Sequence, residues 1–122
     1  MKRGATPNRQ FCLTLDLRDD EGLIREYEQY HQPGHTWPEV IDSIRRSGVL
    51  DMQIYRAGTH LVMVMTVTDS FSFEKKARMD SQNPKVVQWE RLMTRFQLAA
   101  AESRTGAQWK KMQNIFDLSL HD

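Results

Sequence analysis

The chain has 122 residues, 39% of them hydrophobic, and its 17 basic and 16 acidic side chains leave a net charge of +1. This length suits one domain, and so even a charge balance argues against binding to nucleic acid or to an anionic membrane surface. A single cysteine, Cys12, excludes an internal disulfide, and no apolar run approaches the ~20 residues that a membrane helix needs. We therefore expect a soluble, cytoplasmic protein.

The N-terminal segment differs in composition from the rest of the chain. Residues 1 to 9 combine Gly, Pro and basic side chains, so we expect a flexible tail there and one domain over residues 10 to 122. Apolar and polar residues alternate from Phe11 to Asp16, which predicts a strand. In residues 21 to 31 the apolar residues recur with helical spacing, and Asp20 is a suitable N-cap for that helix.

The remaining sequence predicts a second helix, two strands, two more helices and a last strand. The second helix begins at a capping box formed by Thr36 and Glu39 and ends at Gly48. We then expect, in chain order, strands at Met52–Tyr55 and Leu61–Val67, a helix from Phe71 to Met79 capped by Asp69 or Ser70, a helix opened by Asn83-Pro84 that buries Val86, Trp89, Met93 and Phe96, a loop from Ala99 to Gly106 and a strand from Trp109 to Leu118.

This order of elements is the split βαβ pattern of the ferredoxin-like fold, an α+β architecture with a four-stranded antiparallel sheet. Helices on one side would leave the other face of the sheet open. We expect Met63, Met65 and their neighbours to make that face too apolar for water, so a homodimer packed sheet to sheet is predicted.

Among the four histidines, His31 is the candidate for acid–base chemistry. It follows Tyr27 by four residues, so both side chains project from one helix face. A helix C-terminus favours a cation, which would keep the pKa of His31 at or above its ordinary value and suit it as a proton donor. A helix-capping role is the alternative. Because Pro33-Gly34 separates His31 from His35, we predict no metal site.

The other candidate residues have simple structural interpretations. Tyr27 and Trp89 lie on inward stripes, where aromatic side chains usually pack in the core. Cys12 is expected to be a small buried residue, and His60 and His121 to be solvated. Composition and spacing alone predict a dimeric α+β domain with one acid–base candidate, and no particular reaction.

Five short segments carry a family resemblance: Tyr27-Glu28-Gln29-Tyr30-His31, Trp37-Pro38-Glu39, Ser47-Gly48, Ile54-Tyr55 and Trp89-x-x-x-Met93. Their order and spacing, from about Phe11 to Phe116, resemble the L-rhamnose mutarotase family, including its L-fucose mutarotase-like members. The resemblance implies a dimeric ferredoxin-like α/β barrel and an isomerase that interconverts the anomers of a 6-deoxy-hexose with no cofactor and no metal.

The resemblance also implies roles for particular residues. By position, His31 resembles the proton donor of the family, and Tyr27 and Trp89 resemble its sugar-binding aromatics. Glu90 stands where the family has a second Trp, and Met52 stands where it has a Tyr on the second strand. Both are therefore candidate substrate-binding residues. The implied partners are a monosaccharide and a second copy of the chain.

The chemistry of anomer exchange fits these residue types. Opening the pyranose ring requires a proton at the ring oxygen and the loss of one from the anomeric hydroxyl, which an imidazole can assist. A Trp can cover the apolar face of a sugar. Two other classes remain open: a monooxygenase or haem-binding protein on the same barrel, and a sugar-binding protein without catalysis.

Overall fold

The computed structural model of the protein describes residues 9–98 and 109–121. The predicted loop from Ala99 to Gly106 and residues 1–8 of the predicted tail lie outside these described residues. The elements occur in the order β1 (Arg9–Asp16), α1 (Glu21–Tyr30), α2 (Pro38–Arg46), β2 (Val49–Ala57), β3 (His60–Val67), α3 (Phe73–Ser81), α4 (Pro84–Met93) and β4 (Lys110–Lys111), with a short 3-10 helix over Leu118–Leu120.

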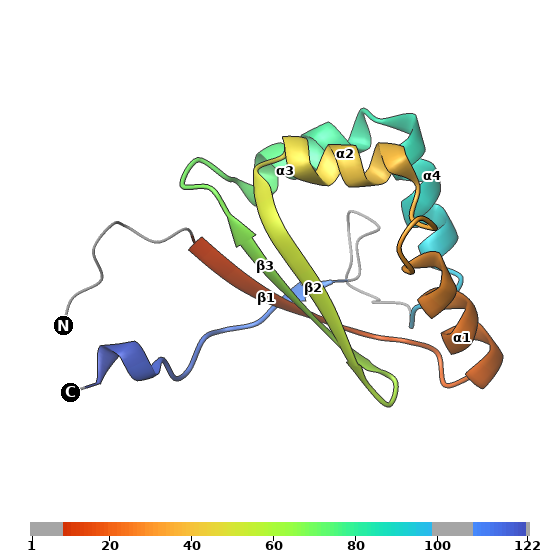
Figure 1. Ribbon diagram of the computed structural model, residues 1–122, viewed down its shortest axis with the longest axis horizontal. Coiled ribbons are helices and arrows are strands. Elements are labelled where there is room, and N and C mark those ends of the chain that lie inside the picture. Colours follow the sequence, from red (N-terminus) through yellow and green to blue (C-terminus); the bar gives the residue numbers. More distant parts are fainter. Residues whose placement is uncertain (1–8, 99–108, 122) are drawn as a thin grey trace.

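The strands form one antiparallel sheet in the order β2-β3-β1-β4, and the helices lie together on one side of it (Figure 1). This arrangement confirms the predicted α+β class and the ferredoxin-like element order. No helix within the described ranges is long and apolar enough to cross a membrane.

The strand register decides which side chains face the helices. β1 and β3 pair Leu13 with Met63, and directly opposite residues of an antiparallel pair point to the same face. Met63 and Met65 therefore lie under the helices, where Met65 and Val67 are buried. The prediction that the two methionines form the open face is wrong, because the helices cover the odd-numbered residues of β3.

The open face is instead composed of smaller and more polar side chains. From β3 it presents Val62, Val64 and Thr66, and from β1 it presents Cys12 and Thr14. All five side chains are half-buried in the single chain, so Cys12 is less buried than its sequence context predicts. An apolar centre of two valines remains at the middle of this face.

Three helix starts test the predicted caps. Asp20 accepts a hydrogen bond from the backbone N–H of Leu23 at 3.0 Å, as expected. The capping box at Thr36 does not form, because the Thr36 hydroxyl donates to the carbonyl of Tyr30 instead. α3 begins later than predicted, since the cap is Ser72 rather than Asp69 or Ser70.

The C-terminal segment departs most from the prediction. Only Lys110–Lys111 pair as a strand, whereas the sequence pattern predicts a strand from Trp109 to Leu118. Beyond β4 the chain runs away from the sheet, and Ile115 is 90% exposed. The backbone N–H of Met112 still donates to the carbonyl of Cys12 at 2.8 Å, but the chain then leaves the edge of β1, so the alternating residues that follow do not extend the sheet.

Two apolar clusters fill the space between helices and sheet. One joins Phe71 to the β-strand residues Leu13, Val49, Met65 and Val67. The other lies under α1 and α4 and contains the buried residues Leu15, Leu17, Tyr27, Val40, Leu61, Trp89, Met93 and Phe96. The stripe predicted for α4 is confirmed, because Val86, Trp89, Met93 and Phe96 are all buried.

Candidate active site

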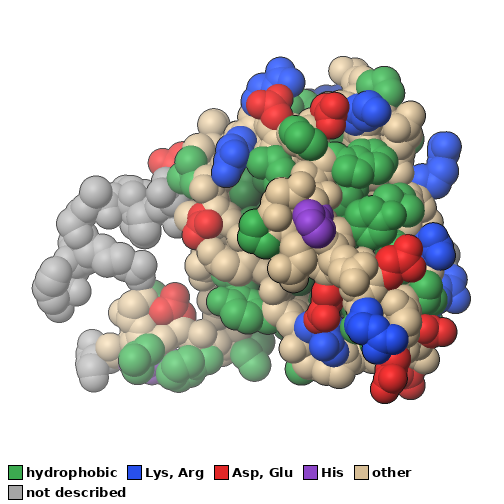
Figure 2. Space-filling view, turned by 45° about the vertical axis from the view of Figure 1, so that its right-hand side comes forward, with side chains coloured by type: hydrophobic (Ala, Val, Ile, Leu, Met, Phe, Trp, Pro, Cys, Tyr) green, Lys and Arg blue, Asp and Glu red, His purple; other side chains and the backbone are tan. Residues whose placement is uncertain are grey.

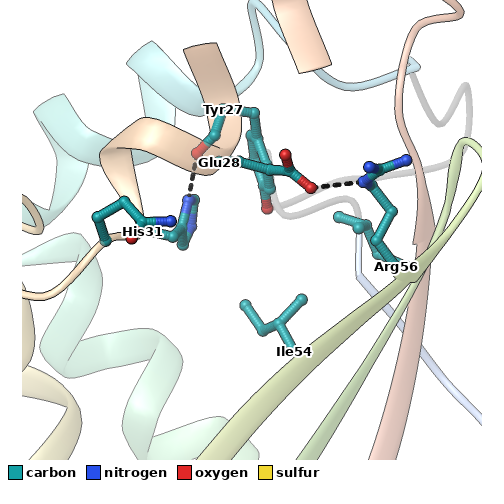
Figure 3. A pocket seen from close by; sticks show the side chains of 7 residues that line it. Tyr27, Glu28, His31, Ile54 and Arg56 are labelled. Carbon is teal, nitrogen blue, oxygen red and sulfur yellow. Dashed lines mark hydrogen bonds and ion pairs between the residues drawn. The ribbon is translucent and has the colours of Figure 1, made fainter. Parts of the chain in front are cut away.

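A cavity of about 300 Å³ lies between α1 and the neighbouring strands β2 and β3. In Figure 3, α1 contributes one wall and Ile54 and Arg56 of β2 approach from the opposite side. The lining side chains are Tyr27, Glu28, His31, Gln32, Ile54, Arg56 and Leu61. The cavity therefore brings together two of the predicted site residues, Tyr27 and His31.

His31 is held by the end of its own helix. It is the C-cap of α1, and its Nδ1 lies 2.7 Å from the carbonyl oxygen of Tyr27 (Figure 3). Because a carbonyl oxygen only accepts, Nδ1 carries the hydrogen in this contact, and Nε2 of the neutral ring is left with a lone pair. The predicted capping role is thus fulfilled by one ring nitrogen, while the other remains available for chemistry.

The electrostatics of His31 differ from the prediction. Burial lowers the pKa of His31 because it penalises the charged imidazolium, and the hydrogen bond to the Tyr27 carbonyl offsets only part of this. The expectation of a pKa at or above the ordinary value is therefore wrong: desolvation outweighs the helix terminus. At neutral pH the ring is mainly uncharged and can accept a proton at Nε2.

Tyr27 combines a core position with a place on the cavity wall. Its side chain is buried, and its ring lies 4.3 Å from that of His31 and 5.8 Å from that of Phe96, centroid to centroid. Burial raises the pKa of Tyr27 to about 12, against the smaller opposing effect of a hydrogen bond with Gln97. The phenol therefore stays protonated, and its main contribution is to fix the neighbouring imidazole.

Trp89 supports the imidazole from α4. Its ring centroid lies 5.7 Å from that of His31 and 5.3 Å from that of Trp37, both in edge-to-face geometry. Trp89 is buried and is not one of the residues that line the cavity. In this chain Trp89 is a core residue that packs against His31, and its direct contact with a sugar stays a prediction.

The structure does not bring Glu90 or Met52 to the cavity. Glu90 faces α3, where burial and the nearby carboxylate of Asp80 raise its pKa and Lys76 partly opposes them. Met52 lies on the helix-covered side of β2 and packs against the cluster around Phe71. Their role in sugar binding remains a prediction.

His60 is not among the residues that line the cavity. His60 is exposed, as predicted, and its Nδ1 lies 2.9 Å from a carboxylate oxygen of Asp16. Within residues 9–98 and 109–121, no three His, Cys, Asp or Glu side chains are grouped as a metal site requires.

Sequence reasoning missed the charged pair on the cavity wall. The Nε of Arg56 lies 2.6 Å from Oε2 of Glu28, and both residues line the cavity. Each had a usable signal: Glu28 follows Tyr27 directly, and Arg56 shares its strand face with Ile54 through the period of two. The two residues are 28 positions apart in the sequence, so their contact depends on the tertiary fold and cannot be predicted from a local sequence pattern.

Comparisons with known proteins agree with this fold. Residues 10–118 match the family model of L-rhamnose mutarotase. The L-fucose mutarotase of Xanthomonas campestris pv. campestris is 42% identical over 110 residues, which cover 90% of this chain and 88% of that protein. The chain therefore belongs to the L-rhamnose mutarotase family.

Two further relatives extend the comparison. A UPF0734 protein of Dictyostelium discoideum is 32% identical over 117 residues, covering 90% of each protein. The crystal structure of an L-rhamnose mutarotase from Formosa agariphila superimposes with a TM-score of 0.67, covering 89% of this chain and 97% of that one at 15% identity. At that identity the superposition supports the shared fold alone.

Proposed function

We propose that this protein is an isomerase that interconverts the α and β anomers of a 6-deoxy-hexose, with no cofactor. Family membership and the 42% identity to an L-fucose mutarotase support this class of reaction. The observation that carries the proposal is the arrangement of His31: it borders a cavity of sugar size, and its Nδ1 is anchored to the helix so that Nε2 is free of that bond.

In the proposed reaction, His31 removes a proton from one oxygen atom of the sugar and returns it to another. Nε2 of His31 takes the proton of the anomeric hydroxyl as the C1–O1 double bond forms and the bond from C1 to the ring oxygen breaks. The imidazolium then acts as the proton donor and delivers that proton to the ring oxygen, which gives the open-chain aldehyde. Rotation about C1–C2 and the reverse steps close the other anomer, so atoms and charge balance. General acid–base assistance of this kind contributes ~10²–10⁴-fold.

The surroundings of His31 support that role. The Tyr27 ring packs against the imidazole on one side and Trp89 meets it at its edge, so the ring orientation is fixed. Because the pKa of His31 is lowered by burial, the neutral form that accepts the first proton is the main form at neutral pH.

L-Fucose is the proposed substrate of first choice. The Xanthomonas relative, which is 42% identical to this chain, is an L-fucose mutarotase. We expect L-fucose to exchange anomers at least as fast as L-rhamnose. Two-dimensional NMR exchange spectroscopy on L-fucose, L-rhamnose and D-galactose tests this: enzyme-dependent exchange of L-rhamnose with none of L-fucose would overturn the choice of sugar. Binding without faster exchange of any of the three would indicate a non-catalytic sugar-binding protein.

We further propose a homodimer that packs through the open sheet face. Val62 and Val64 form the apolar centre of that face, and Tyr55 beside them is 61% exposed. Ile115 and Phe116 of the C-terminal segment are also exposed, and Figure 2 shows apolar side chains on a projection that stands clear of the main body. A second copy would cover both surfaces. Sedimentation of the chain as a monomer at micromolar concentration would contradict this.

A further inference from the structure

The cavity has a second polar feature besides His31, the ion pair between Glu28 and Arg56. Arg56 Nε donates to Oε2 of Glu28 at 2.6 Å, and its Nη1 donates to the carbonyl of Gly58 at 2.8 Å. The guanidinium is thereby fixed both to the β2–β3 turn and to α1. In Figure 3 the carboxylate of Glu28 lies on the side of the cavity away from His31, directed toward Arg56.

The pair is poorly explained by stability alone. The two side chains are 36% (Arg56) and 45% (Glu28) exposed, and ion pairs at such positions contribute little to folding. Asp42 and Arg46 on α2 form a comparable exposed pair, but theirs joins neighbouring turns of one helix. The pair of Glu28 and Arg56 joins a helix to a strand on the cavity wall, where it fixes the position of a carboxylate beside the space that a ligand would fill.

A fixed carboxylate beside a sugar-sized cavity matches the chemistry of a polyol. An ionised carboxylate only accepts hydrogen bonds and has two oxygens for them, while sugar hydroxyls are donors. Such bonds are charge-assisted and are stronger than those between neutral groups.

We infer that Glu28 binds hydroxyls of the sugar and that Arg56 is the positioning residue that holds its carboxylate in place. Glu28 and His31 lie three residues apart at the C-terminal end of α1, so a sugar anchored by Glu28 presents its ring to the imidazole. This inference rests on the proposed mutarotase function, because it assumes that the cavity takes a sugar.

The test compares Glu28→Gln with Glu26→Gln. Both substitutions change a carboxylate of α1 to an amide, and Glu26 also has a cationic partner, Arg95 at 3.6 Å, but it does not line this cavity. For each variant and the wild type, the dissociation constant of L-fucose is measured by NMR titration, and KM and kcat for anomer exchange by exchange spectroscopy. We expect Glu28→Gln to raise the dissociation constant and KM about tenfold with kcat within about twofold of wild type. Glu26→Gln should leave all three unchanged.

Arg56 supplies the second arm. Arg56→Met should raise KM for L-fucose, and Arg56→Lys should restore part of the loss because an ammonium keeps the charge but not the two-point geometry. Binding is measured separately from exchange, so the two proposals can fail separately. A wild type that binds L-fucose but accelerates anomer exchange of none of L-fucose, L-rhamnose and D-galactose would refute the proposed function and leave the inference to be judged by the dissociation constants.

Three results would overturn the inference. One is an unchanged dissociation constant and KM in Glu28→Gln. Another is a fall of kcat at constant KM with loss of one limb of the pH profile, which would make Glu28 a proton-transfer group. The third is a wild type that binds none of L-fucose, L-rhamnose and D-galactose, which would refute both proposals.

Discussion

The two ends of the layer between helices and sheet use the same aromatic packing for different purposes. At one end, Phe11, Phe71 and Phe73 contact each other edge to face or tilted at centroid distances of 5.0–6.3 Å, above the buried Val67. At the other end, Tyr27 and Trp89 pack as closely, but they pack around an imidazole. The first end is core, and the second is core that holds one titratable group at the edge of a cavity.

This difference shows what turns a core into a site. An imidazole surrounded by rings is partly desolvated, which lowers the pKa of His31, and one nitrogen is hydrogen-bonded while the other is not committed to that bond. The phenylalanine end carries no such group on its three rings. Substitutions at the two ends should therefore cost similar stability but differ in their effect on activity.

The largest expected effect is that of Trp89→Ala. Truncating a buried tryptophan should lower the free energy of unfolding by ~3–5 kcal/mol, and the folded fraction should have lost anomer exchange because His31 is no longer held in orientation. Phe71→Ala is the matched variant at the other end: it should cost a similar free energy, while the exchange rate per folded molecule stays at the wild-type level. Denaturant titration and exchange NMR measure the two quantities. Equal losses of activity in both variants would show that the ends do not differ.

Tyr27→Phe should have a smaller effect that separates the ring from its hydroxyl. The ring contact with His31 remains, and the lost hydrogen bond to Gln97 should cost about 1 kcal/mol at neutral pH, with a moderate fall in exchange rate. A variant with wild-type exchange would show that the hydroxyl takes no part in orienting the site.

The alkaline pH range gives Tyr27→Phe a distinctive signature. In the wild type, the unfolded phenol ionises near pH 10 and the folded one near 12, so the unfolded chain binds fewer protons between these values and stability falls as pH rises. The variant should lack this part of the decline. Thermal melts between pH 9 and 11 compare the two, and identical slopes would contradict the raised pKa.

The smallest expected effect is the contribution of His31 to stability at acid pH. The pKa of His31 is lowered in the folded state, so below pH ~6.5 the imidazole is protonated more readily in the unfolded chain than in the folded protein. The free energy of unfolding therefore decreases as the pH is lowered, until the folded imidazole is protonated as well. Melting temperatures of the wild type and His31→Ala between pH 7.5 and 5 isolate this part, since the other histidines are common to both. A wild type that gains stability relative to the variant on acidification would contradict the lowered pKa.

Much of the fold was predictable because its signals are local. Alternation located β1, a near-continuous apolar stretch located β3, and helical spacing with a proline at the first turn located α4 and its buried stripe. The predictions failed where contacts with residues outside a segment determine the structure of that segment. The hydroxyl of Thr36 bonds to Tyr30 rather than capping α2, and the chain leaves the edge of β1 after Met112, so the alternating residues beyond it do not extend the sheet.

The site was predictable in part for the same reason. Tyr27 and His31 share a helix face, so their spacing alone places them together. Glu28 and Arg56 come from elements 28 residues apart, and their ion pair depends on how α1 lies over β2. The pKa of His31 depends on how deeply its ring is packed, which a position at a helix end does not reveal.

The most direct test of the central claim is anomer exchange in His31→Ala. The residue caps a helix and is only half-buried, so the variant should fold with a melting temperature close to that of the wild type and should still bind L-fucose. We predict that exchange spectroscopy will show wild-type acceleration of anomer exchange and a rate in His31→Ala that falls ~10²–10⁴-fold, to that of the sugar in water. A folded His31→Ala protein that keeps most of the wild-type rate would contradict this role of the imidazole and would place the proton exchange on another group of the cavity.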